Sequence, residues 1–188
     1  MTPQLQSPIL LEEDPFLDLC QANPDLKIEQ TAAGELLIMP PTGGETGRQN
    51  AELLADFIFW NRQTRLGVVF DSSTCFLLPR GGRRSPDVAW VAKARWQALT
   101  PRERQQFPPL CPDFVLELLS PSDSLALTQT KMEEYLNSGL RLGWLLNPLA
   151  KTATIYRPGQ PAEILEKPRE LEGEDVLPGF LLRIAWLW

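Results

Sequence analysis

The sequence predicts an α/β fold in which a central mixed β-sheet is flanked by α-helices. Short apolar runs alternate irregularly with two longer segments of helical periodicity, at 45–64 and 122–138. The 18 prolines of this 188-residue chain cluster between the apolar runs, as expected where turns join short strands. The length suits a single domain with a real core, which we place at 26–188, after an N-terminal arm over 1–25.

The first half of the domain predicts a hairpin, a long helix and several strands. Two apolar-alternating runs within 26–41 flank Ala33 and Gly34, which favours an N-terminal β-hairpin. The helix over 45–64 has an apolar face made of Ala51, Leu54, Phe57, Ile58 and Asn61. Strands are expected at 67–71, 74–79 and 85–92. A capping box with Thr100, Pro101 and Glu103 then starts a short helix.

The second half predicts a central strand, a helix and a further hairpin. The strand is "DFVLELLS", at 113–120. The helix begins after Ser122 or Ser124 and ends before Gly139, with an apolar stripe at Leu125, Met132, Tyr135 and Leu136. Runs at 142–148 and 152–158 indicate a hairpin that 162–166 extends, and a strand or short helix closes the chain.

Composition excludes several classes of protein. The chain has no histidine, which removes Ser-His-Asp catalysis, Cys-His catalysis and histidine-ligated zinc. Its three cysteines form neither a disulfide framework nor a zinc signature. No apolar run reaches the roughly 18 residues of a membrane span, and the start lacks the basic region of a signal peptide. We therefore expect a cytoplasmic protein that contacts no membrane.

The charge distribution leaves room for a nucleic-acid partner. The net charge of -6 argues against a surface that binds nucleic acid everywhere. Residues 80–106, however, carry seven basic and two acidic groups. This segment is either a solvated face or a region where Arg83 and Arg84 contact a phosphate backbone.

Two carboxylates stand out because each lies at or inside an apolar strand. Asp87 follows Pro86 at a strand start, and Glu117 lies among leucines in the central strand. Burying a carboxylate is costly unless it is paired, protonated or bound to a metal. Side by side, the two would suit Mg²⁺ or Mn²⁺. Structural alternatives stay open, since Asp87 could cap a turn and Glu117 could pair with Arg84.

Two further charged residues have ordinary as well as functional interpretations. Lys131 lies at the edge of the apolar stripe of helix 122–138, where a lysine either snorkels to solvent or reaches over the strand end. Glu45 lies in the first turn of helix 45–64, where a carboxylate favourably meets the helix dipole.

The segments "PPTGGETGRQNAEL", "RSPDVAWV" and "PDFVLELLSPSDSLALTQTKMEEYLNSGLRLGWLLNP" resemble the Uma-two type putative endonuclease family of the PD-(D/E)XK superfamily. The resemblance implies a restriction-endonuclease-like fold with a Mg²⁺-dependent site for phosphodiester hydrolysis. Asp87 matches the "PD" aspartate and Glu117 the second acidic position. The superfamily's lysine would stand at Leu119, and Lys131 matches the place to which this family moves it. Glu45 matches an acidic position of the first helix that completes such sites.

We thus expect a Mg²⁺- or Mn²⁺-dependent endonuclease acting on DNA, with Asp87 and Glu117 as metal ligands and Lys131 and Glu45 as further catalytic residues. Two rivals stay open: a catalytically inactive binding or assembly protein on the same fold, and a metal-dependent phosphatase of small molecules. The apolar end with Trp186 and Trp188 docks either on its own core or on a partner, and we expect a homodimer.

Overall fold

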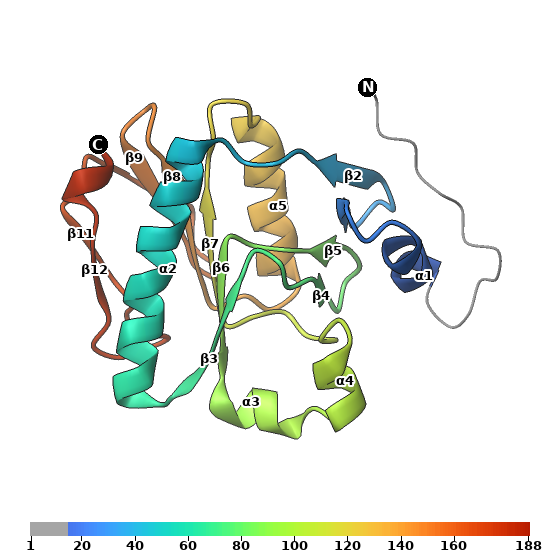
Figure 1. The fold of residues 1–188 in the computed structure, drawn as a ribbon. Coiled ribbons are helices and arrows are strands. Elements are labelled where there is room, and N and C mark those ends of the chain that lie inside the picture. The colour runs from blue at the N-terminus through green and yellow to red at the C-terminus, as the bar shows by residue number, and fades with distance from the viewer. Residues whose placement is uncertain (1–14) are drawn as a thin grey trace.

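A six-stranded mixed sheet forms the centre of the computed structural model, which describes residues 15–188 (Figure 1). In spatial order its strands are β10 (Glu163–Glu166), β9 (Thr152–Tyr156), β8 (Leu142–Asn147), β7 (Phe114–Leu118), β6 (Val88–Ala92) and β3 (Gly67–Asp71). Neighbouring strands are antiparallel except β7 and β8, which are parallel. The predicted fold class is confirmed, and β7 is an interior strand, as its continuous apolar run predicted.

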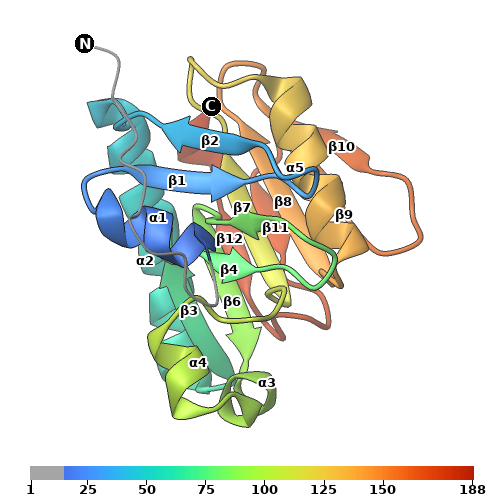
Figure 2. The ribbon, with the colours of Figure 1, turned by 90° about the vertical axis from the view of Figure 1, so that its right-hand side faces the viewer.

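A second, smaller sheet crosses in front of the main one (Figure 2). Its strands are β2 (Leu36–Met39), β1 (Lys27–Gln30), β5 (Arg83–Arg84) and β4 (Phe76–Leu77). β1 and β2 form the predicted hairpin, with Ile28 paired to Ile38. The helix α1 (Pro15–Ala22) packs beside it through the buried Phe16, while the rest of the expected arm, at 1–14, lies outside the described residues.

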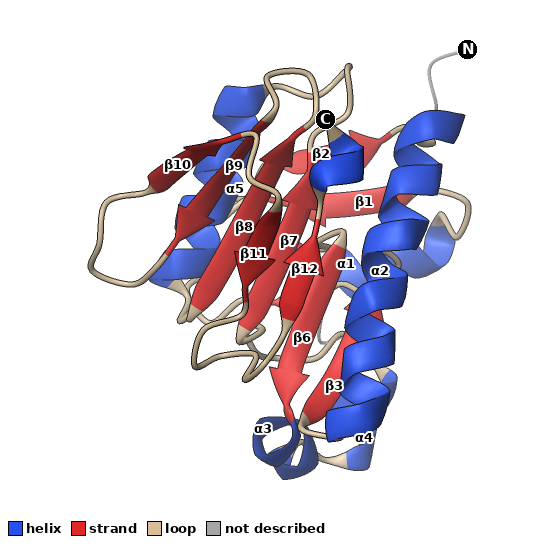
Figure 3. Ribbon diagram, turned by 90° about the vertical axis from the view of Figure 1, so that its left-hand side faces the viewer, coloured by secondary structure: helices blue, strands red, loops and turns tan. Residues whose placement is uncertain are grey.

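Helices cover both faces of the main sheet. On one face lie α2 (Gly44–Thr64) and the hairpin of β11 (Glu170–Glu172) and β12 (Leu181–Arg183), as Figure 3 shows. On the other face lie α5 (Leu125–Asn137) and the small sheet. Each face has its own apolar core, so side chains that alternate along β6 and β7 enter different cores.

The buried face of α2 differs from the prediction. Leu53, Phe57 and Trp60 are buried, whereas Ala51 is exposed and Leu54 and Ile58 are only partly covered. The aromatic rings decide the rotation of the helix, because Phe57 and Trp60 both pack against Phe180 (ring centroids 4.4 and 5.4 Å apart). Phe180 lies more than a hundred residues further along the chain, beyond the reach of local periodicity.

In the other helices, the predicted capping residues are confirmed more fully than the predicted buried faces. Ser124 caps α5, and the capping box of Thr100 and Glu103 starts α4 (Pro101–Gln105) as predicted. On α5, Met132 and Tyr135 are buried as expected, but Leu125 in the first turn is 43% exposed. The helix α3 (Lys93–Ala98), which directly follows β6, was not predicted.

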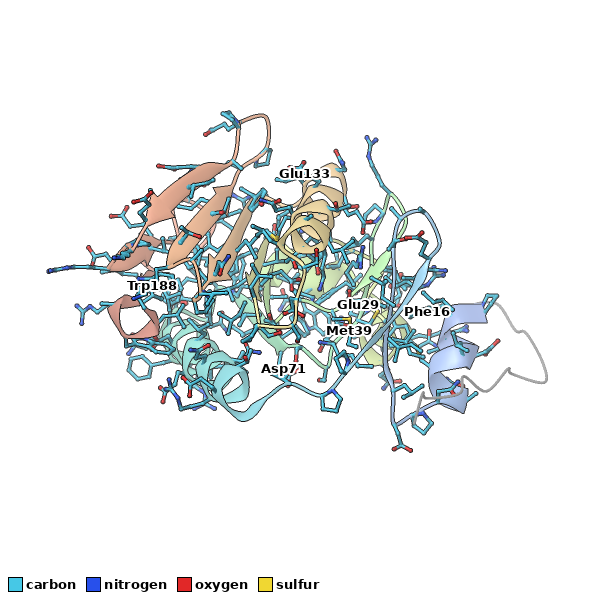
Figure 4. All side chains as sticks on the ribbon, turned by 90° about the horizontal axis from the view of Figure 1, so that it is seen from above. Phe16, Glu29, Met39, Asp71, Glu133 and Trp188 are labelled. Atoms are coloured by element: carbon cyan, nitrogen blue, oxygen red, sulfur yellow. The ribbon has the colours of Figure 1, made fainter. Side chains whose placement is uncertain are left out.

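The chain ends in a 3₁₀ turn, η1 (Ala185–Leu187), that docks on the protein's own core. Leu187 is buried, and the indole of Trp188 donates a hydrogen bond to the Pro168 carbonyl (2.7 Å; Figure 4). This docking explains the apolar tail without a partner, and the homodimer stays a prediction. Among residues 15–188, no helix is long and apolar enough to cross a lipid bilayer.

Close packing at the start of β3 gives a test of the sheet. A Cβ atom at Gly67 would lie 2.3 Å from the Val91 carbonyl oxygen and 2.4 Å from the Trp90 indole. We expect Gly67→Ala to lower the free energy of unfolding by about 1–3 kcal/mol, measured by chemical denaturation. The control is Gly47→Ala in α2, where the new Cβ meets nothing within 4 Å and should be neutral or stabilising. Equal effects of the two substitutions would contradict this packing.

Candidate active site

Asp87 and Glu117 come together because β6 and β7 are adjacent antiparallel strands. Val88 pairs with Leu116, so the same register places residue 87 opposite residue 117. Val115 and Leu119 belong to the core beneath α5, and strand alternation therefore points Glu117 to the same side. The predicted meeting of the two carboxylates is confirmed.

Asp87 is held at the strand entrance by one firm and one long hydrogen bond. Its Oδ2 accepts from the Leu118 backbone N–H (2.8 Å), and its Oδ1 accepts from the Asn50 side-chain amide of α2 (3.4 Å). Burial raises the pKa of Asp87, although the Leu118 N–H and the charge of Lys131 oppose the shift. The Asn50 Oδ1 atom is buried and has no hydrogen-bond partner within the described part of the chain.

Lys131 lies inside this cluster rather than at the edge of the helix. Its Nζ is 2.8 Å from Glu117 Oε1 and 3.0 Å from Glu29 Oε1, and it donates to the Ser85 carbonyl at 3.3 Å. The side chain is 11% exposed, so the snorkelling alternative is wrong. Burial alone would lower the pKa of Lys131, but the carboxylates of Glu117 and Glu29 outweigh it and raise the pKa. The ammonium therefore stays charged.

Glu29 is the member of the site that sequence reasoning missed. It comes from β1, is 1% exposed, and accepts from Lys131, from Arg84 Nη1 (3.1 Å) and from the Ser85 backbone N–H (3.2 Å). Burial raises its pKa, but Lys131 and Arg84 outweigh burial and the pKa lies below the ordinary value. Figure 4 places Glu29 where the N-terminal strands meet the body of the protein. The available signal was a charged residue inside an apolar hairpin strand.

Glu117 binds two partners through one oxygen. The Tyr135 hydroxyl donates to the Oε1 atom (3.1 Å) that also faces Lys131. Burial, reinforced by Asp87 and Glu29 and opposed by Lys131, raises the pKa of Glu117 to about 7. Burial and the negative charge of Glu117 likewise raise the pKa of Tyr135. Tyr135 is thus a neutral donor, and the predicted pairing of Glu117 with Arg84 is replaced by pairing with Lys131.

Arg84 braces the cluster and does not face solvent. Its guanidinium is 3% exposed and forms ion pairs with Glu29 (3.1 Å) and with Glu134 of α5 (2.7 Å). The expected contact of Arg84 with a phosphate backbone does not fit this burial. Arg83, on the other face of β5, donates to the Gln30 side chain (2.6 Å) and lies over the Phe16 ring.

Glu45 is the predicted site residue that the structure does not bring to the cluster. Its side chain is 68% exposed and pairs with Arg48 one turn along α2 (2.7 Å). Among the described residues, no hydrogen bond or ion pair joins it to Asp87, Glu117 or Lys131. Glu45 is the second residue of α2 and faces solvent, whereas Asn50 is the residue of this helix that reaches Asp87.

The charges of the site do not cancel. We use the name buried charge cluster for its four carboxylates and two cations: Glu29, Asp87, Glu117, Glu134, Arg84 and Lys131. If all are ionised, two negative charges are left over, which the neighbouring charge of Lys27 offsets in part. Burial is the main cause of the raised pKa values of Asp87 and Glu117, and the other carboxylates add to it. A divalent cation would remove the same excess.

The oxygen atoms around Asp87 and Glu117 can bind such a cation without a complete set of protein ligands. Within residues 15–188, no three Cys, Asp or Glu side chains are arranged to hold a metal. Mg²⁺ commonly uses only one or two protein carboxylates and completes its shell with water and phosphate oxygens. Asp87, Glu117 and the unpartnered Asn50 Oδ1 offer oxygen ligands of that kind.

Comparisons with known proteins agree on a nuclease fold. Residues 13–185 match the family described as Uma2, putative restriction endonuclease. A crystal structure of a putative nuclease belonging to DUF820, from Anabaena variabilis, superposes with a TM-score of 0.72 at 22% sequence identity. That match covers 86% of this chain and 91% of the other. No curated protein is significantly similar to the chain.

The raised pKa of Glu117 predicts a specific pH dependence of stability in metal-free buffer. The folded protein holds this proton to about pH 7, whereas the unfolded chain releases it near 4.5. The free energy of unfolding should therefore fall as the pH rises through this window, by up to about 3 kcal/mol.

Glu117→Gln removes this titration while keeping the shape of the side chain. Chemical denaturation at about pH 5 and pH 8 should show a smaller decline for the variant than for the wild type. Parallel curves for the two proteins would contradict the assignment of the proton to Glu117.

Proposed function

Because the chain belongs to the Uma2 family of putative restriction endonucleases, we propose that it is a metal-dependent endonuclease that hydrolyses phosphodiester bonds in DNA. One observation carries the proposal: the ammonium of Lys131 lies 2.8 Å from Glu117, and Glu117 stands opposite Asp87 on the neighbouring strand. A buried cation beside paired carboxylates at the end of a sheet can bind a metal ion and a phosphate together.

Asp87 and Glu117 are the proposed metal ligands, with the Asn50 amide oxygen as a neighbouring polar atom. The fit rests on the oxygen-only donor set and on the two excess negative charges of the buried charge cluster. When bound, Mg²⁺ or Mn²⁺ supplies Lewis-acid stabilisation of the phosphate and lowers the pKa of water.

Lys131 acts in this proposal as a fixed positive charge and not as a base. Its raised pKa keeps the ammonium protonated, so it cannot remove a proton from water. A protonated amine stabilises negative charge that develops on the scissile phosphate, and its ion pair fixes the proposed ligand Glu117. Leu119, which holds the position of the usual lysine, is buried in the apolar core, so Lys131 is the only one of the two positions that can do this.

Glu29 is proposed as a positioning residue for Lys131. It holds the ammonium together with Glu117 and is itself fixed by Arg84 and the Ser85 N–H. Without Glu29, the lysine would keep one carboxylate partner and could turn about its flexible stem.

Removal of one ligand charge tests the metal site. We expect Glu117→Gln to keep the fold, to lose Mg²⁺-dependent cleavage of plasmid DNA, and to bind Mn²⁺ at least tenfold more weakly by calorimetry, roughly as the loss of one carboxylate ligand requires. The matched control is Glu166→Gln on the exposed part of β10, which should cleave and bind as the wild type does.

Undiminished cleavage by Glu117→Gln would contradict the proposal. A wild-type protein that binds no Mn²⁺ and cleaves no DNA would favour a non-catalytic binding protein on this fold. Hydrolysis of free nucleotides without cleavage of any polymer would favour the small-molecule phosphatase.

Glu29→Gln tests the positioning of Lys131. The substitution keeps the size of the side chain but weakens its hold on the ammonium, so kcat should fall about 10–100-fold while Mn²⁺ affinity and KM change little. Glu134→Gln is the control, because Glu134 pairs with Arg84 and not with Lys131. An equal loss of kcat in both variants, accompanied by equal loss of thermal stability, would show that Glu29 is only a structural brace.

A further inference from the structure

An open surface cavity lies at the opposite end of α2 from Asn50, the residue of this helix that contacts Asp87. Its volume is about 580 Å³, and it is formed by the end of α2, the start of β3 and α3. These segments lie side by side in Figure 1.

Three cations line this cavity, and no carboxylate does. Arg62 and Arg65 come from the end of α2, and Lys93 comes from the start of α3. All three are exposed, and none forms an ion pair with another residue of 15–188. We call these three residues the basic triad. In a chain with net charge -6, such a concentration of unpaired positive charge is unusual.

Helix electrostatics explain only part of the basic triad. Cations are favourable at the C-terminus of a helix, which accounts for Arg62 and Arg65 at the end of α2. Lys93, however, is the first residue of α3, where the helix end favours anions. Its place beside two arginines adds repulsion that an anionic ligand would relieve.

We propose that the basic triad binds a backbone phosphate of the nucleic-acid substrate, away from the bond that is cut. The inference rests on the proposed nuclease function and extends it to a second contact. Arginine forks match phosphate oxygens in two-point hydrogen bonds, and lysine adds a point charge. Contacts of this kind fix the register of a duplex without reading its sequence.

The strand β6 sets the spacing between the two sites. Asp87 and Lys93 are six positions apart along β6 and its ends, which corresponds to about 20 Å of extended chain. At 3.4 Å per base pair, this is roughly six base pairs of duplex DNA. A duplex that ran parallel to β6 would therefore present to the basic triad a phosphate about half a helical turn from the scissile one.

The salt dependence of binding tests the proposal. In a Glu117→Gln background, which prevents cleavage, the triad is neutralised by Arg62→Gln, Arg65→Asn and Lys93→Gln. Asparagine is chosen because residue 65 has φ 56°, which asparagine tolerates. The matched control neutralises three exposed cations elsewhere, by Lys151→Asn, Lys167→Asn and Arg169→Gln, with asparagine again at the two positions of positive φ.

Affinity for a duplex of about 30 base pairs is measured by fluorescence anisotropy between about 50 and 200 mM salt. Each lost phosphate contact lowers the slope of log Kd against log salt by about 0.9, so the triad variant should lose roughly 2–3 in slope. The control variant should keep the slope of the parent. An unchanged slope in the triad variant, or an equal loss in both, would overturn the proposal.

Two further measurements separate this inference from the proposed function and from a free anion. In the cleavage-competent protein, neutralising the triad should raise KM and leave kcat nearly unchanged. If the triad variant cleaves DNA with the kcat and KM of the wild type, the proposed triad contact is overturned and the proposed nuclease function stands. Inorganic phosphate is titrated into both proteins by calorimetry. If the triad variant loses phosphate binding but keeps the DNA affinity of its parent, a nucleic-acid ligand for the triad is overturned.

Discussion

The ion pairs of one buried ammonium join the parts of this protein. Lys131 on α5 contacts Glu117 of the main sheet and Glu29 of the small sheet. Because both ion pairs are buried, this one side chain ties α5 to both sheets. The N-terminal hairpin is therefore part of the site, although it lies about sixty residues before the first strand carboxylate that we predicted.

The same ion pairs leave the site with an excess of carboxylates, which favours the binding of a cation. Four carboxylates surround two cations, and without metal part of the excess is met by protons on Glu117, whose pKa burial raises to about 7. A metal ion would exchange with those protons, so affinity should be coupled to pH. The family match supports a nuclease, the structural similarity shows the fold, and the substrate and metal belong to the proposal.

Sequence reasoning succeeded where local chemistry decides the structure. The apolar strands around Asp87 and Glu117, the cap at Ser124 and the N-terminal hairpin all follow from nearby residues. It failed where a contact between residues distant in the sequence decides the structure. Glu29 acquires its role from a lysine 102 positions away, and Phe180 sets the rotation of α2. Glu45 matched a family position, but its local partner Arg48 and its exposure place it outside the cluster.

The single parallel pair in the main sheet has a consequence for the displaced lysine. Parallel neighbours need a crossover connection, and between β7 and β8 that connection is α5. The helix must therefore return across the face that Glu117 points to, and Met132 and Tyr135 seat it there. A lysine on this crossover helix therefore lies next to the strand carboxylate, although it is not on the same strand. In such a fold the lysine can stand either on the strand or on the crossover helix, and its positive charge occupies the same place in space.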